Sequence, residues 1–155
     1  MRHSYQLFYS EPEEKSPFPM ARLYVGQHEV STYRSLSVDW AGGGIISTSE
    51  DLLLFIKALV NHTLLKAETF EKMKDWAGFA RGIDYGYGLM SFKFKKVFFL
   101  LSSKLDMWGN SGSPGAYMYY NPFFDVYLTG SFNQMKYEKK HIRFLIKVLN
   151  YLAKL

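Results

Sequence analysis

The residues best suited to chemistry lie in one short stretch, residues 107–118, which contains Asn110, Ser111, Gly112 and Ser113. Asn110 carries an amide that donates and accepts hydrogen bonds without a charge, and Ser111 carries a hydroxyl that could bind a carboxylate. Gly112 has no side chain, so the backbone of a bound molecule could approach it closely. The stretch lies between two apolar runs of strand character, and its glycines also fit a plain strand and turn that need them for packing. Both interpretations stay open from the residues alone.

Other residue types that support catalysis or metal binding are scattered. Cysteine is absent, which excludes disulfides, zinc fingers and cysteine nucleophiles. The histidines lack the spacing of metal ligands, and we interpret them as surface or locally hydrogen-bonded residues. We therefore expect no metal and no cofactor. The histidines are His3, His28, His62 and His141.

The composition limits the class of protein. A chain of 155 residues, 48% hydrophobic and 18% aromatic, predicts a globular protein with large buried surfaces. Its net charge of +5 would suit an anionic partner, but the basic residues are spread along the chain, so we favour simple solubility. The tyrosines of residues 117–127 lack interleaved basic residues, so we expect no nucleic-acid partner. No signal peptide is visible, and the longest apolar run, residues 97–101, is too short to span a bilayer. The localisation stays open.

The elements that must position residues 110–113 begin with an irregular arm. Residues 1–38 show no sustained hydrophobic period, and residues 39–44 are a glycine-dense turn. Ser47 and Glu50 fit a capping box at the start of a helix. Apolar residues then recur at helical spacing, which predicts an amphipathic helix. These residues are Leu52, Phe55, Ile56, Leu59 and Val60.

A shorter helix is predicted over residues 67–76, and the period then changes to that of strands. Residues 137–155 predict a long closing helix, because their polar side chains form one narrow stripe. The predicted strands span residues 85–92, 95–101, 108–120 and 125–133.

Several segments in this order resemble one family of hydrolases. Residues 39–52 resemble the glycine-rich turn and helix start that follow the second catalytic motif of class C β-lactamases and D-alanyl-D-alanine carboxypeptidases. Residues 85–89, Tyr-Gly-Tyr-Gly-Leu, resemble the family's Tyr-Gly-x-Gly strand. Residues 108–115 lie where members carry Gly-His-Ser/Thr-Gly and a Pro-Gly turn, and residues 1–5 and 19–24 resemble further family tracts. The chain thus resembles the C-terminal portion of a serine β-lactamase or penicillin-binding protein, a bacterial family linked to the cell wall.

This resemblance implies a third-motif role for residues 110–113. Ser111 and Gly112 would contact substrate, and the backbone N–H of Ser113 would be one of two oxyanion-hole donors. Asn110 stands where the family carries Lys or His, so the site would lack the charge that attracts a substrate carboxylate. The parent reaction would be acyl transfer on D-Ala-D-Ala peptides, β-lactams or esters.

The nucleophile that the family needs is missing from the sequence. It is a serine with a lysine three residues later, and no serine of this chain has one. Residues 119–121 and 131–133 match the second motif in composition but follow the third motif, so we interpret both as structural. We expect the C-terminal half of a β-lactamase-like domain that is inactive alone. The alternative is a non-catalytic binding or interaction module that retains the fold.

The expected fold is α/β, or α+β in stricter usage, with one domain over residues 1–155. We expect an antiparallel sheet of three to five strands flanked by helices, a partial β-lactamase/transpeptidase-like fold with a long C-terminal helix. Without the other half, a sheet edge and an apolar face would lie uncovered, so we expect self-association or a complementing N-terminal half. A completed site would take a small peptide or a β-lactam-like ligand. The expected parts are the arm (1–38), the glycine turn and helices (39–78), the strands (83–134) and the closing helix (137–155).

Overall fold

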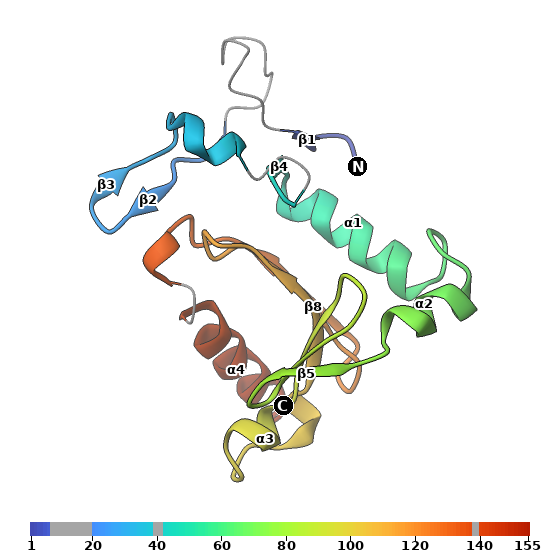
Figure 1. Cartoon of the computed structure of the whole chain (residues 1–155). Helices are drawn as coiled ribbons and strands as arrows, with labels where there is room; N and C mark the ends of the chain where they lie inside the picture. Colours follow the sequence, from blue (N-terminus) through green and yellow to red (C-terminus); the bar gives the residue numbers. More distant parts are fainter. Residues whose placement is uncertain (7–19, 39–41, 138–139) are drawn as a thin grey trace.

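A six-stranded antiparallel sheet forms the centre of the computed structural model, with strand order β10-β9-β8-β7-β6-β5 (Figure 1). The structure describes residues 1–6, 20–38, 42–137 and 140–155. Positions 39–41 of the expected glycine turn therefore lie outside the described residues. The strands are β5 (Ala77–Ala80), β6 (Ile83–Tyr85), β7 (Met90–Phe92), β8 (Met107–Ser111), β9 (Tyr117–Asn121) and β10 (Val126–Gly130).

Helices cover both faces of this sheet. Met107 of β8 packs in one core cluster with Leu145 of the closing helix. Its neighbour Trp108 packs on the other side, with its ring 5.3 Å from that of Phe70. Because successive side chains of a strand point to opposite faces, α4 lies on one face and α1 and α2 lie on the other (Figure 1). The helices are α1 (Ser49–Val60), α2 (Ala67–Met73) and α4 (Lys140–Leu152).

The N-cap of the first helix lies one residue later in the sequence than the predicted N-cap, Ser47. Thr48 is the N-cap, and its hydroxyl accepts a hydrogen bond from the N–H of Asp51 at 3.1 Å. Ser47, the predicted cap, shares a hydrogen bond of 2.8 Å with the hydroxyl of Ser4. The Ser47 and Glu50 box is therefore wrong, because a tertiary contact takes the serine. The helix itself is confirmed, with its apolar side inward.

Two of the predicted strands are hairpins. Residues 85–92 divide into the end of β6 and the whole of β7, and residues 108–120 divide into β8 and β9. Gly88 and Gly115 lie in the two turns, each with a φ of +75°, which glycine adopts without a steric penalty. β5 is a further strand that the sequence does not predict, because Ala-Gly-Phe-Ala shows no alternation. The antiparallel α+β class is confirmed, but the sheet has six strands instead of three to five.

The predicted strand over residues 95–101 is wrong. The chain forms a short helix, α3 (Phe94–Val97), followed by a turn. The carboxylate of Asp106 accepts a hydrogen bond from the N–H of Phe94 at 2.9 Å and so holds the start of this helix. That contact joins residues twelve positions apart, and local periodicity cannot show it.

The N-terminal part contains only short pairings among the described residues. β1 (Tyr5–Gln6) pairs with β4 (Ile45–Ile46), and β2 (Tyr24–Val25) pairs with β3 (His28–Glu29). The predicted closing helix is confirmed in type but begins at Lys140, and residues 138–139 lie outside the described part. The remaining elements are the 3-10 helices η2 (Arg34–Ser37), η3 (Ser103–Leu105) and η4 (Met135–Tyr137).

Candidate functional site

The four residues predicted to form a third motif lie together at the end of β8. Asn110 and Ser111 are the last two residues of the strand, opposite Met118 and Tyr117 of β9. Gly112 and Ser113 follow in the turn, where both are exposed. The sheet therefore presents this segment at a strand end, next to solvent.

The side chains of Asn110 and Ser111 do not converge. Asn110 Nδ2 donates to the carbonyl of Gly88 at 3.3 Å, and its Oδ1 accepts from the N–H of Ser111 at 2.8 Å. The Ser111 side chain interacts with that of Tyr119, which is fully buried on the α4 face and whose hydroxyl donates to Sδ of Met90 at 3.9 Å. Burial raises the pKa of Tyr119, and the hydrogen bond with Ser111 opposes part of that rise. Successive side chains of a strand point to opposite faces of the sheet, so Asn110 and Ser111 contact different residues.

The turn after β8 is held by the segment that follows β10. The carbonyl of Pro114 accepts from the N–H of Gln134 at 2.9 Å, and the carbonyl of Gly115 accepts from the N–H of Phe132 at 3.2 Å. The Gln134 side chain also accepts from the N–H of Gly26 at 2.8 Å and donates to its carbonyl at 2.7 Å. These bonds tie the candidate site to the β2–β3 hairpin. Sequence reasoning missed Gln134, because the contact joins residues 108 positions apart.

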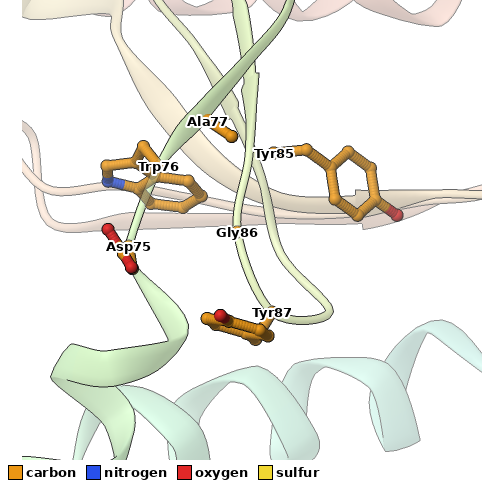
Figure 2. A pocket seen from close by; sticks show the side chains of 6 residues that line it. All are labelled: Asp75, Trp76, Ala77, Tyr85, Gly86 and Tyr87. Atoms are coloured by element: carbon orange, nitrogen blue, oxygen red, sulfur yellow. The ribbon is translucent and has the colours of Figure 1, made fainter.

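A pocket of about 310 Å³ opens beside the end of α2 and the β6–β7 turn (Figure 2). Three of its six lining residues are aromatic, and one carries a carboxylate. In Figure 2, Trp76 and Tyr85 lie on either side of the strand that carries Gly86. None of residues 110–113 lines the pocket. The β6–β7 turn beside the pocket does contain Gly88, whose carbonyl accepts the hydrogen bond from Asn110. The lining residues are Asp75, Trp76, Ala77, Tyr85, Gly86 and Tyr87.

The apparent second-motif match at residues 119–121 is structural, as the sequence indicates. Asn121 is fully buried, and its Nδ2 donates to the carbonyls of Lys104 and Asp106 at 2.9 and 3.0 Å. Its Oδ1 accepts from the N–H of Phe124 at 2.8 Å. All of these partners belong to the protein, so Asn121 fixes the β9–β10 turn.

The described part of the chain contains no cluster of metal-binding side chains and no membrane-spanning helix. Within residues 1–6, 20–38, 42–137 and 140–155, no three His, Asp or Glu side chains are grouped to hold a metal ion. No helix in those same ranges is both long and apolar enough to cross a bilayer. Two histidines pack against aromatic rings: His141 stacks on Tyr117, and His62 meets the ring of Phe70.

An antiparallel sheet with helices on both faces, and with the Asn-Ser-Gly segment at the end of a strand, is consistent with a partial β-lactamase-like fold. No family model and no curated protein matches the chain. The structure is similar to that of a D-stereospecific amidohydrolase from Streptomyces sp., with a TM-score of 0.61 and 28% sequence identity. That amidohydrolase belongs to the penicillin-binding protein/β-lactamase superfamily, so the similarity supports a hydrolase-like fold for this chain. The match covers 77% of this chain, which spans 36% of the length of the amidohydrolase.

Proposed function

We propose that this chain forms the third-motif wall of the active site of a serine hydrolase in the penicillin-binding protein/β-lactamase superfamily. The observation that carries the proposal is the similarity to the D-stereospecific amidohydrolase over 77% of the chain. The order of the resembling segments and the position of residues 110–113 at the end of β8 agree with it. The reaction would be acyl transfer on an amide or ester, such as a D-Ala-D-Ala peptide or a β-lactam.

The residues of the β8 end supply part of that chemistry. In the proposed site the backbone N–H of Ser113, in the exposed turn, donates one hydrogen bond to the developing oxyanion. Ser111 holds the substrate carboxylate after its hydroxyl turns from Tyr119. Asn110 adds no charge, and its side chain positions the Gly88 turn. The serine nucleophile and its lysine come from a polypeptide segment outside these residues, since no serine here has a lysine three positions later.

A fluorescent penicillin, which acylates the nucleophilic serine, tests this proposal. The chain alone remains unlabelled, and mixing it with a segment that carries Ser-x-x-Lys and Tyr-x-Asn, encoded upstream of it, produces labelling. Ser111→Ala lowers the labelling rate of the mixture, whereas Ser35→Ala, an exposed serine of η2, leaves it unchanged. Labelling of the isolated chain would contradict the external nucleophile.

A second candidate function is a non-catalytic module that binds a peptide. The observation that favours it is Asn110, whose amide is hydrogen-bonded within the protein and which replaces the family's basic residue. Titration calorimetry of the isolated chain with an acyl-D-Ala-D-Ala peptide distinguishes the two candidates. Saturable binding without hydrolysis supports the module, and absence of binding supports the incomplete hydrolase.

A further inference from the structure

Four apolar residues in a row stand exposed at the end of α3, and we call residues 97–100 the apolar tip. The exposed fractions are 44% for Val97, 48% for Phe98, 75% for Phe99 and 70% for Leu100. Single exposed apolar side chains are ordinary, but a contiguous group on a protein surface marks an interaction site. In Figure 1, α3 lies at the lower end of the molecule, below α1 and α2.

The residues on either side of the apolar tip anchor it to the hydrophobic core. Phe94 before it is 1% exposed in the α4-face core, and Leu101 after it packs against the same core. The backbone N–H of Phe98 donates to the carbonyl of Phe94 at 3.0 Å, and that of Leu101 donates to the carbonyl of Phe98 at 3.0 Å. Two backbone N–H groups of the turn thus have hydrogen-bond acceptors within the protein. This lowers the free-energy cost of transferring the turn from water into an apolar phase.

The segment that carries the apolar tip is positively charged. Residues 77–106 contain five basic and two acidic side chains, a surplus of three positive charges. The acids pair locally, Asp84 with Lys96 at 3.6 Å and Asp106 with Lys93 at 3.8 Å. Lys95 lies exposed in α3 beside the tip. The remaining basic residues are Arg81, whose Nε donates to the carbonyl of Lys96, and Lys104 of η3.

We propose that the apolar tip inserts shallowly into an anionic lipid surface, with the surrounding basic side chains at the headgroups. Phenylalanine and leucine supply the apolar area, and lysine supplies the attraction to anionic lipid, the combination that interfacial anchors use. A second copy of the chain fits this surface less well, because a twofold contact would place two positive rims against each other. This docking mode is independent of the proposed acyl transfer.

Vesicle sedimentation of the full chain tests the proposal. The chain binds vesicles of phosphatidylcholine with one third phosphatidylglycerol, and binding weakens as salt is raised. The double variant Phe99→Ser with Leu100→Ser loses about ten-fold or more in affinity, because it removes the inserting area. Its control is Leu54→Ser, an exposed residue of α1, which binds like the wild type.

The lysines are tested by a matched pair of variants. Lys95→Gln weakens binding about five-fold, the effect of one basic residue near an anionic surface, whereas Lys66→Gln at the start of α2 has no effect. A Phe99→Trp variant shows a blue-shifted emission with these vesicles. Equal binding to pure phosphatidylcholine, or no binding, overturns the proposal. So does a dimer in light scattering that the Phe99 and Leu100 double variant makes monomeric, since a second copy then covers the tip.

Discussion

Gly109 lies in β8 where this strand and β9 approach too closely for a side chain. A Cβ atom on Gly109 would lie 1.9 Å from the carbonyl oxygen of Met118 and 2.8 Å from the Cα of Tyr119. The φ of Gly109 is +156°, a value that residues with a side chain rarely adopt. The pairing that carries the candidate site therefore depends on this glycine.

Gly109→Ala is expected to lower the free energy of unfolding by about 3 kcal/mol or more, because backbone atoms of β9 must move. Urea denaturation measures the change. Gly78→Ala is the matched control, since no atom lies within 4 Å of a Cβ at Gly78 in β5. It should change stability by about 1 kcal/mol or less. Equal losses for both variants would contradict the close approach at Gly109.

At the scale of elements, Asp51 joins the first helix to the N-terminal segment. Its carboxylate accepts hydrogen bonds from the N–H of Arg2 at 2.9 Å, the N–H of His3 at 2.7 Å and the hydroxyl of Ser4 at 2.8 Å. Burial acts to raise the pKa of Asp51, but these hydrogen bonds and the positive charge of the N-terminus together outweigh it and lower the pKa to about 2. The ionised carboxylate thus holds residues 1–6 on α1.

This attachment is expected to be acid-labile. The pKa of Asp51 is about 2 in the folded state and 3.8 ordinarily, so the folded value is depressed. The stabilisation is then full above about pH 4 and is lost as the pH falls through about 2. Hydrogen exchange of the Arg2 and His3 amides, followed from pH 5 to 2, measures the loss.

Asp51→Asn should remove most of this pH dependence and leave the two amides less protected at every pH. Asp75→Asn, an exposed carboxylate of the pocket, is the control and should exchange like the wild type. Acid-dependent exchange that persists in Asp51→Asn would assign the effect to another group.

At the scale of the whole molecule, β5 leaves one edge of the sheet unpaired. All four residues of β5 are exposed, and the strand pairs only with β6. An open edge is a template for another strand. We therefore predict that the expected self-association uses this edge, with a second copy of the chain pairing at β5.

Phe79→Lys should block that pairing, because a charged side chain on an edge strand disfavours strand addition. Size exclusion with light scattering, over a range of concentrations, should show association of the wild type and less of it in the variant. Leu54→Lys, on the exposed side of α1, provides the control. A wild type that stays monomeric at every concentration would contradict self-association at β5.

The sequence by itself determined the amphipathic α1, the closing helix, the antiparallel α+β class and the place of residues 110–113 after an apolar run. It also showed that no serine has a lysine three positions later. These features depend on the period of side chains along one element or on residue identity alone, so they can be read without knowing what packs against what.

Only the tertiary structure decided how those elements divide and where their side chains go. Asp106 starts α3 in place of a predicted strand, and Gln134 ties the candidate site to Gly26. Asn110 and Ser111, adjacent in sequence, serve opposite faces of the sheet. The physical reason is that each outcome depends on a hydrogen bond or packing contact between residues far apart in the sequence. The hydrophobic period within one element does not predict such contacts.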